Sequence, residues 1–401
     1  MAGSMDGLRL GRLRDEVERR LPEFLGDLEE IVSIDSGSYS KAGVDRVGEW
    51  MAGRLEALGA SIERHRNAEL GDTFVATLDG SGDGPTVMLI GHTDTVFESG
   101  TVAERPFEIR DDKVLGPGAR DMKSGLLVGL YALGALQAVG GSGDGWLPAG
   151  RVVYVVDPDE EIGSPLSTPI IRGLAVDAEF ALVLEGARAN GDIVSARKGM
   201  VHFRATIKGR AAHAGVEPEK GRSAVLEAAH KTLALHRVNG RWNGVTVNVG
   251  AIDGGTRPNI VAERAVMAID MRAWLSSEQR EADAAIRDIL ASSSVTGVTT
   301  TVKVTAHHRP MEKTEASARL AEVAARIADE LGFELHDTGT GGGSDANTTA
   351  GAGVPTLDGL GPVGGNDHTP SEYIELSSIV PRTTLLAGLL ASLGQDEAAR
   401  R

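Results

Sequence analysis

Cysteine is absent from the 401 residues of the chain, which excludes both disulfide bonds and thiolate metal ligands. Any metal that the chain binds must therefore be held by histidine, aspartate or glutamate. Long basic runs are also absent, and 41 Lys and Arg stand against 57 Asp and Glu, a formal charge of −16. A chain of this charge is not expected to bind nucleic acid or an anionic membrane surface.

Long apolar runs are missing as well. The N-terminal stretch lacks the apolar core of a signal peptide, and no run approaches the ~20 apolar residues of a membrane span. We therefore expect a soluble protein located in the cytoplasm. With 41% apolar residues, the chain can bury a sizeable core and is long enough for two domains.

Predicted strands and helices alternate along most of the chain. The apolar stretches TVMLIGH, RVVYVV and FALVLEG are typical of buried strands, and DMKSGLLVGLYALGALQAVG is typical of a buried helix. This alternation predicts an α/β fold with a mainly parallel sheet.

The middle of the chain follows a different pattern. From about Lys198 to His308 the order is β-α-β-β-α-β, which is a self-contained split βαβ unit. We therefore predict a discontinuous first domain, residues 1–196 and 310–401, and a second domain, residues 197–309, inserted into it.

Each predicted core strand is followed by acidic residues or a histidine, and two loops add one residue each. The set is His92 and Asp94 after TVMLIG, Glu160 and Glu161 after RVVYVVDPD, Glu185 after FALVL, Asp121 at the start of a helix in GPGARDMKSG, and His368 in GGNDHTPSEY. Sites in open α/β sheets form beyond the carboxyl ends of the strands, so we expect these side chains to meet. Nitrogen and oxygen ligands without sulfur suit one or two divalent ions such as Zn²⁺.

Taken singly, each of these residues has a simpler explanation. A histidine after a strand is more often structural than a ligand, and an aspartate that opens a helix, such as Asp121, usually only caps it. Adjacent glutamates usually lie in a solvated loop. Asp94 is well placed to orient the ring of His92. The joint occurrence of these residues at successive strand ends is what favours a metal site.

Seven stretches of the chain, in order, resemble the signature blocks of the co-catalytic dinuclear zinc exopeptidases: GHTDTV, GPGARDMKSG, DEEIGS, the Glu of LEG, AAHAG, GGGSDA and DHTPSEY. That family includes aminoacylases, the desuccinylase of diaminopimelate synthesis, acetylornithine deacetylase and bacterial glutamate carboxypeptidases. The blocks are most similar to glutamate carboxypeptidase of the carboxypeptidase G type. The resemblance implies a zinc-peptidase catalytic domain with an inserted ferredoxin-like dimerisation or lid domain.

The resemblance also implies a role for each residue. Asp121 would bridge two metal ions, with His92 and Glu185 completing one site and Glu161 and His368 completing the other. Asp94 would hold His92, and Glu160 would act as general base. His213 of AAHAG would stabilise the oxyanion, and Asn259 of RPNIV and Arg272 of DMRAW would lie near the substrate carboxylate. By its chemistry alone, Arg309 in HHRPM is a further candidate for binding an acidic side chain, because arginine matches a carboxylate bidentately.

The implied activity is hydrolysis of an amide bond next to a free C-terminal carboxylate, releasing glutamate or aspartate from N-acyl or peptidyl substrates. The implied cofactors are two divalent ions, with Zn²⁺ favoured and Co²⁺ or Mn²⁺ also compatible with the ligands. The implied partners are a small or dipeptide-like substrate and a second copy of the chain. That copy would pair through a strand edge of the inserted domain, in the run after AAHAG or its partner.

Several alternatives stay open at this point. An N-acyl amino acid deacylase, or a dipeptidase without acidic preference, would share the same metal centre. The Gly-rich loop 339–344 could belong to a nucleotide-binding protein, although it lacks the Walker lysine and a GxGxxG pattern. A metal-binding scaffold without catalysis is disfavoured because Glu160 is present. No role is assigned to Asp157, Asp159, Arg197 or Lys198, and the two aspartates are expected in a loop or around the metal ligands.

Overall fold

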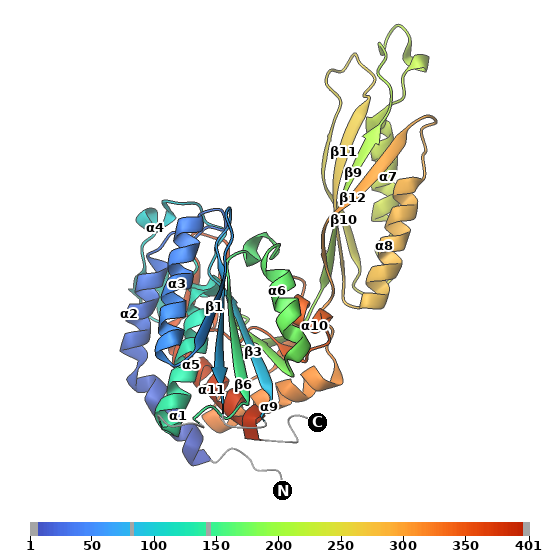
Figure 1. Cartoon of the computed structure of the whole chain (residues 1–401). Coiled ribbons are helices and arrows are strands. Elements are labelled where there is room, and N and C mark those ends of the chain that lie inside the picture. Colours follow the sequence, from blue (N-terminus) through green and yellow to red (C-terminus); the bar gives the residue numbers. More distant parts are fainter. Residues whose placement is uncertain (1–6, 81–83, 142–145, 396–401) are drawn as a thin grey trace. The chain divides into compact units, whose positions relative to one another are not determined.

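The computed structural model describes residues 7–80, 84–141 and 146–395. Contacts between Cα atoms divide the chain into two compact units, which are coloured along the sequence in Figure 1. The first unit comprises Met1–Ser195, Lys313–Gly339 and Ser344–Arg401, and the second comprises Ala196–Glu312 and Thr340–Gly343. We predicted divisions after residues 196 and 309, and the contacts divide the chain after 195 and 312.

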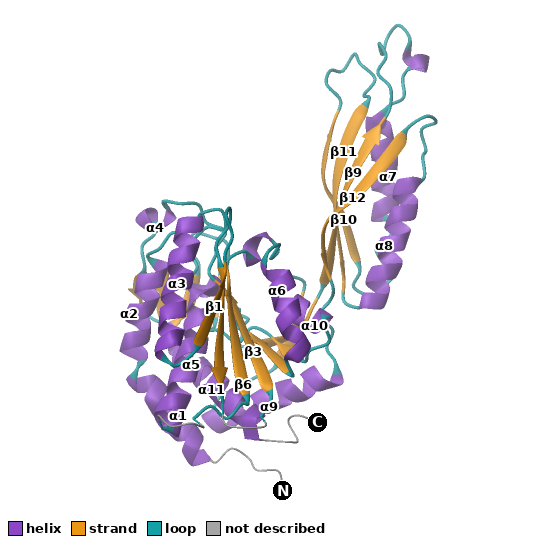
Figure 2. Cartoon of the chain, viewed as in Figure 1, coloured by secondary structure: helices purple, strands orange, loops and turns teal. Residues whose placement is uncertain are grey.

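A six-stranded sheet forms the centre of the first unit, in the order β1-β2-β6-β3-β7-β14. Its strands are β1 (Ser61–His65), β2 (Thr73–Asp79), β3 (Thr86–His92), β6 (Arg151–Asp157), β7 (Phe180–Val183) and β14 (Thr356–Leu357). The four strands β6, β3, β7 and β14 run parallel, whereas β1 and β2 pair antiparallel at one edge. The prediction of an α/β fold with a mainly parallel sheet is therefore confirmed (Figure 2).

Helices cover both faces of this sheet. They are α1 (Gly7–Arg19), α2 (Leu21–Val32), α3 (Lys41–Ala57), α5 (Ser124–Gly140), α6 (Ser167–Leu174), α9 (Glu315–Leu331), α10 (Ala346–Gly351) and α11 (Ile379–Gln395). Alternate side chains of β3 point to opposite faces, so Val87 and Leu89 join the core beneath α5 and α11, while Met88 and Ile90 are buried on the other side. The helix α5 is apolar all round and lies almost wholly within the core.

Short elements connect the longer strands and helices of the first unit. They are α4 (Thr101–Glu104), the turns η1 (Ala119–Lys123), η2 (Glu160–Ile162), η3 (Ala175–Asp177) and η5 (Leu376–Ser378), and a small sheet of β4 (Glu108–Arg110), β5 (Lys113–Leu115), β15 (Gly364–Gly365) and β16 (Tyr373–Glu375). The strands β8 (Ile193–Arg197) and β13 (Asp337–Thr340) span points where the chain passes from one unit to the other.

The second unit is an antiparallel sheet in the order β10-β11-β9-β12 with two helices. Its elements are β9 (Gly199–Lys208), η4 (Pro218–Lys220), α7 (Ala224–His236), β10 (Thr246–Gly254), β11 (Arg264–Ala273), α8 (Ser276–Ala291) and β12 (Thr299–His308). Alternate residues of β9 are buried, so one face of the sheet packs against the helices in a separate core. This is the β-α-β-β-α-β arrangement that the sequence pattern predicts.

Two local predictions were wrong. Asp121 was expected at the start of a helix, but it lies before α5, in η1, where Asp121 and Met122 have non-helical backbone angles and are joined by a cis peptide bond. The run after AAHAG supplies no strand edge, because it forms η4 and then α7. The edge strands of the second sheet are β10 and β12.

Two stretches of the described chain are long and apolar enough to span a membrane by length and composition alone. They are Ala119–Gly140 and Leu376–Gly394, and 83% and 72% of their most apolar windows are buried inside the protein. Core helices pass the same test, and both stretches pack in the core of the first unit.

Gly125, at the start of α5, sets how closely this helix approaches the strand end that carries Glu185. A Cβ atom at Gly125 would lie 1.9 Å from the carbonyl oxygen of Leu184, which is backbone and cannot move aside easily. We expect Gly125→Ala to lower the free energy of unfolding by about 1–3 kcal/mol.

The matched control is Gly53→Ala in α3, where no atom lies within 4 Å of the added Cβ. Because alanine favours a helix by up to about 1 kcal/mol over glycine, this variant should be unchanged or more stable. Urea unfolding followed by circular dichroism measures both. Equal effects of the two substitutions would contradict the packing argument.

Candidate metal centre

The residues at the carboxyl ends of three neighbouring parallel strands, and just beyond them, lie at one edge of the sheet. His92 is the last residue of β3 and lies opposite Asp157, the last residue of β6. Glu160 and Glu161 follow β6 in η2, and Glu185 follows β7, which pairs with β3 on its other side. The parallel register therefore brings together side chains that are far apart in the sequence.

Asp121 lies between two groups of potential metal ligands. Its Oδ1 is 3.1 Å from His92 Nε2, and Glu185 Oε1 is 3.5 Å from the same nitrogen. Its Oδ2 is 3.1 Å from His368 Nε2, which lies 3.3 Å from Glu161 Oε2. Each carboxylate oxygen of Asp121 thus belongs to a different triad, one with His92 and Glu185 and one with Glu161 and His368, and within each triad the ligand atoms all lie within 4.8 Å of one another.

Asp94 connects the histidine of one triad to the glutamates of η2. His92 Nδ1 lies 2.9 Å from the Asp94 carbonyl oxygen, which leaves Nε2 facing Asp121. The fully buried Asp94 carboxylate accepts hydrogen bonds from Ser38 Oγ at 2.6 Å and from the backbone N–H groups of Glu160 and Glu161, each at 3.2 Å. Asp94 therefore fixes both the His92 ring and the start of η2.

Two positioning residues were missed by the sequence reasoning. The Glu372 carboxylate accepts from the backbone N–H groups of Gly118, Arg120 and Asp121, at 3.2, 2.8 and 3.0 Å. These bonds hold the loop that presents Asp121. Burial raises the pKa of Glu372 to about 7 in spite of these three bonds. Its only sequence signal was its place in DHTPSEY, close to His368.

The buried Arg120 side chain links the loops that carry Glu185 and His368. Its Nη2 donates to the carbonyl oxygen of Ala187 at 2.7 Å, and its Nη1 forms an ion pair with Asp367, the residue before His368. The sequence gave no signal for this role of Arg120, because its partners Ala187 and Asp367 lie more than 60 residues away along the chain.

The charges of the site depend on one another. Burial raises the pKa of Glu185 to about 7 and raises that of Glu160 well above its usual range. The carboxylates of Asp121 and Glu161 raise the pKa of His368 to about 11. In the absence of a cation, protons on the histidines and glutamates offset the negative charge of the cluster.

The residues present fit a pair of divalent ions. The donors are imidazole nitrogens and carboxylate oxygens, which are ligands that Zn²⁺ accepts in open, catalytic sites. Glu161 Oε1 is buried and lacks a hydrogen-bond partner within the described residues. A buried carboxylate oxygen without a partner is costly unless a cation neutralises it.

The remaining aspartates of VVDPDEE lie behind the ligands rather than in a solvated loop. Asp157 and Asp159 are both fully buried. Asp159 accepts from the backbone N–H of Leu166 at 2.6 Å and from the hydroxyl of Ser167, so it anchors the turn that follows η2. Burial and the neighbouring Asp345 carboxylate raise the pKa of Asp157 well above its usual range.

The predicted substrate residues His213, Asn259, Arg272 and Arg309 all lie in the second unit. His213 and Asn259 are exposed and lie on adjacent segments, because the N–H of Ala214 donates to the Asn259 carbonyl oxygen at 3.0 Å. Arg272 donates to Asp270 Oδ2 at 3.1 Å and to the carbonyl oxygen of Gly341 at 2.7 Å. Arg309 is exposed just after β12.

The Gly-rich loop 339–344 presents carbonyl oxygens to arginines. Arg272 Nη1 binds Gly341 O, and Arg197 Nη1 lies 3.1 and 3.3 Å from the carbonyl oxygens of Gly342 and Gly343. A phosphate cradle needs backbone N–H groups turned toward the anion, so this arrangement argues against a nucleotide-binding loop. It also gives Arg197 a structural role that the sequence did not indicate.

Comparisons with known proteins agree with this geometry. A model of the peptidase family M20/M25/M40 matches residues 88–392. The chain is similar to carboxypeptidase G2 of Pseudomonas sp. (strain RS-16), with 29% identity over 97% of this chain and 94% of that protein. It is also similar to acetylornithine deacetylase of Proteus mirabilis, with 27% identity over 95% of this chain and 99% of that protein. Its fold resembles aminopeptidase PepT from Bacillus cereus, with a TM-score of 0.78, 23% identity, and coverage of 93% and 98% of the two chains.

The raised pKa values predict how stability depends on pH and metal. A carboxyl such as Glu185, whose pKa rises from 4.5 to about 7 on folding, stabilises the fold fully below pH 4.5 and loses that contribution as the pH rises through 7. His368, raised from 6.5 to about 11, acts in the same direction at higher pH. We expect the melting temperature of metal-free protein to fall between about pH 5 and about pH 8.

Added Zn²⁺ should reverse this trend, because its ligands must be deprotonated and binding releases protons. The increase in melting temperature caused by zinc should therefore grow with pH. Differential scanning fluorimetry of chelator-treated protein, with and without Zn²⁺, measures both effects. A zinc-induced increase that is largest in acid would contradict the ligand assignment.

Proposed function

Because the chain belongs to peptidase family M20/M25/M40, we propose that it is a metal-dependent hydrolase that cleaves an amide bond beside a free C-terminal carboxylate and releases glutamate or aspartate. The observation that carries this proposal is the placement of the two Asp121 oxygens in separate triads, at 3.1 Å from His92 and 3.1 Å from His368. A carboxylate shared in this way suits two ions held close together.

The proposed ligands are His92 and Glu185 for one ion and Glu161 and His368 for the other, with Asp121 between them. Zn²⁺ is the favoured metal, and Co²⁺ or Mn²⁺ could use the same nitrogen and oxygen ligands. Two such ions supply Lewis-acid chemistry, since they activate a water molecule and polarise the scissile carbonyl. No nucleophilic serine or cysteine is then required.

Glu160 is the proposed general base. It belongs to neither triad, yet its backbone is held against Asp94 next to Glu161. Its pKa is raised well above the usual range, chiefly by burial, so its deprotonated carboxylate is a stronger proton acceptor than that of an exposed glutamate. It would take a proton from the attacking water and pass it to the nitrogen of the leaving amine.

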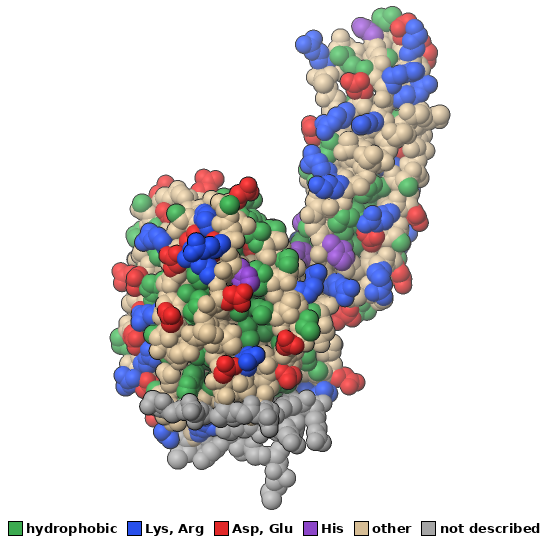
Figure 3. Space-filling view, viewed as in Figure 1, with side chains coloured by type: hydrophobic (Ala, Val, Ile, Leu, Met, Phe, Trp, Pro, Cys, Tyr) green, Lys and Arg blue, Asp and Glu red, His purple; other side chains and the backbone are tan. Residues whose placement is uncertain are grey.

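The charge of the second unit supports an anionic substrate. Residues 196–312 and 340–343 contain 17 Lys and Arg and 11 Asp and Glu, a formal charge of +6, although the whole chain has −16. Figure 3 shows these basic side chains spread over the elements β9 to β12. We propose that Arg272, Arg309 and Asn259 bind carboxylates of the substrate and that His213 stabilises the oxyanion.

Two further assignments are part of the proposal. A homodimer would pair through an edge strand of the second unit, β10 or β12, because these two strands form the edges of its sheet. A cytoplasmic location is also proposed.

A deacylase or dipeptidase without acidic preference is the second candidate function. The similarity to acetylornithine deacetylase extends over 95% of this chain and supports it directly. The metal centre is compatible with both candidates, so the amino acid side chain that the enzyme accepts decides between them.

Glu160→Gln tests the proposed base. The amide keeps the size of the side chain but cannot accept the proton, so we expect kcat to fall by about 10²–10⁴-fold. Metal content, measured by plasma mass spectrometry, should stay equal to that of the original protein. Asp177→Asn, an exposed acid in η3, is the control and should leave both unchanged. Full activity of the Glu160 variant would remove the assigned base.

Arg272→Met tests the proposed acidic preference. With N-benzoyl amino acids ending in Glu, Asp, Ala, Leu or Arg, we expect Glu or Asp to be released fastest. Loss of a charged hydrogen bond should lower kcat/KM for these two by roughly 10- to 100-fold.

Arg280→Met, an exposed arginine in α8, is the matched control. An equal loss for all five substrates would show that Arg272 binds the main-chain carboxylate instead. Release of a neutral residue ahead of Glu and Asp in the unaltered enzyme would contradict the glutamate assignment.

A further inference from the structure

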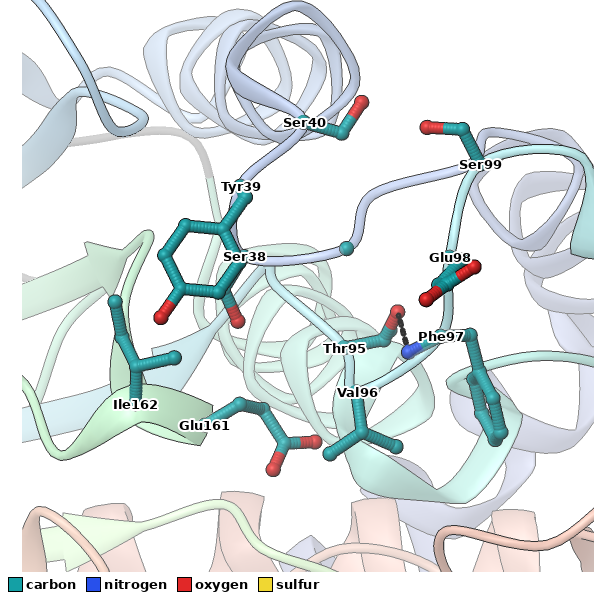
Figure 4. A pocket seen from close by; sticks show the side chains of 11 residues that line it. Ser38, Tyr39, Ser40, Thr95, Val96, Phe97, Glu98, Ser99, Glu161 and Ile162 are labelled. Atoms are coloured by element: carbon teal, nitrogen blue, oxygen red, sulfur yellow. Dashed lines mark hydrogen bonds between the residues drawn. The ribbon is translucent and has the colours of Figure 1, made fainter. Parts of the chain in front are cut away.

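A pocket adjoins the metal centre within the first unit. Its volume is about 640 Å³, and two loops, Gly37–Ser40 and Thr95–Ser99, form most of its wall together with Glu161 and Ile162 of η2. Because Glu161 belongs to one of the two triads, the pocket and the candidate metal centre share a residue. In the view of Figure 4, the ring of Tyr39 lies across the pocket from the carboxylate of Glu98.

We propose that this pocket binds the acyl portion of the substrate, the group on the carbonyl side of the scissile amide, and that it selects a flat, uncharged acyl group over an acidic one. The inference deepens the proposed function and rests on it, because it presumes that the amide is cleaved at the adjoining metal centre. The pocket and not the metal ligands would then determine which N-acyl amino acids are hydrolysed.

The charge of the lining excludes the carboxylate end of the substrate. Among the described residues, the lining contains no lysine, arginine or histidine, and its two charged side chains are Glu98 and Glu161. Glu161 faces His368 at 3.3 Å and would be neutralised further by a metal ion, whereas Glu98 is exposed at the far side. The nearby Arg105 does not line the pocket. Its guanidinium stacks on the Phe97 ring and donates a hydrogen bond to the carbonyl oxygen of Thr369.

The uncharged part of the lining favours an aromatic or apolar group. Tyr39 is 79% exposed and Val96 is 42% exposed, and both line the pocket. A tyrosine ring in this position offers a face for a second ring, with about 0.5–1.5 kcal/mol beyond the area buried. Hydroxyl groups of Ser38, Ser40 and Ser99 add hydrogen-bonding atoms without charge.

The two loops hold the pocket open before any substrate arrives. The N–H of Ser38 donates to the carbonyl oxygen of Thr95 at 3.2 Å, and the N–H of Thr95 donates to that of Ser36 at 2.9 Å. A Cβ atom at Gly37 would lie 2.2 Å from the carbonyl oxygen of Phe97. The two loops are therefore so close at this point that only glycine fits at position 37. Ser38 also bonds Asp94, which ties this wall to the metal ligands.

The test compares kcat/KM of the zinc-loaded enzyme for N-benzoyl-, N-acetyl- and N-succinyl-glutamate. We expect benzoyl to exceed acetyl and acetyl to exceed succinyl. Glu98→Gln should raise the succinyl-to-acetyl ratio by about 3- to 10-fold, because it removes one charge repulsion near the surface. Glu98→Lys should raise it further. Glu104→Gln, an exposed acid in α4 outside the lining, should leave the ratio unchanged.

Tyr39→Ala should lower the benzoyl-to-acetyl ratio by about tenfold, and Tyr39→Phe should restore it, because the ring and not the hydroxyl makes the contact. The inference is overturned if succinyl is the best acyl group in the unaltered enzyme, if Glu98→Gln leaves the succinyl ratio unchanged, or if Tyr39→Ala lowers all three substrates equally.

A failure of the proposed function can be separated from a failure of this inference. If no N-acyl-glutamate is hydrolysed, the proposed function fails, and the pocket is judged by binding alone. Saturation-transfer NMR with benzamide then decides the matter. Binding that is lost in Tyr39→Ala and kept in Glu104→Gln supports an aromatic pocket, and absence of binding to the original protein overturns it.

Discussion

A shared carboxylate, Asp121, between two histidine–glutamate triads is the interaction on which the rest of the site depends. Its oxygens lie 3.1 Å from His92 and 3.1 Å from His368, and these contacts bring the ends of β3, β7 and η2 to the loop after β15. Such a concentration of buried acids is costly unless positive charge offsets it. Protons on the histidines provide that charge in the metal-free protein, and divalent ions would replace them. The fold therefore builds a site whose stability and whose chemistry depend on the same cations.

The surrounding network explains how a fold can hold this cluster in place. Asp94 fixes the ring of His92 and the backbone of the two glutamates in η2, while Glu372 holds the backbone that presents Asp121. Arg120 connects the loops that follow Glu185 and precede His368. Each connection is made by a buried charged group whose partners come from distant segments, so the ligands are oriented before a metal binds. The same network reaches the acyl pocket through the hydroxyl of Ser38.

The sequence was most informative where local pattern and topology coincide. Apolar stretches that end in acids or histidines predicted the parallel strands, and the rule that sites lie beyond their carboxyl ends brought His92, Glu161 and Glu185 together. The edge strand β1 was less visible, because few of its residues are apolar. Asp121 was expected at a helix start and lies in η1, whose backbone depends on Glu372, a contact across 251 residues. Long-range contacts of this kind, like those of Arg120, leave no local signal.

The measurement that tests the central claim most directly is anomalous diffraction at the zinc edge from crystals grown with Zn²⁺. The account predicts two peaks on opposite sides of the Asp121 carboxylate, about 3.5–4 Å apart, one beside His92 and Glu185 and one beside Glu161 and His368. A single peak, or two peaks of which neither contacts Asp121, would contradict it.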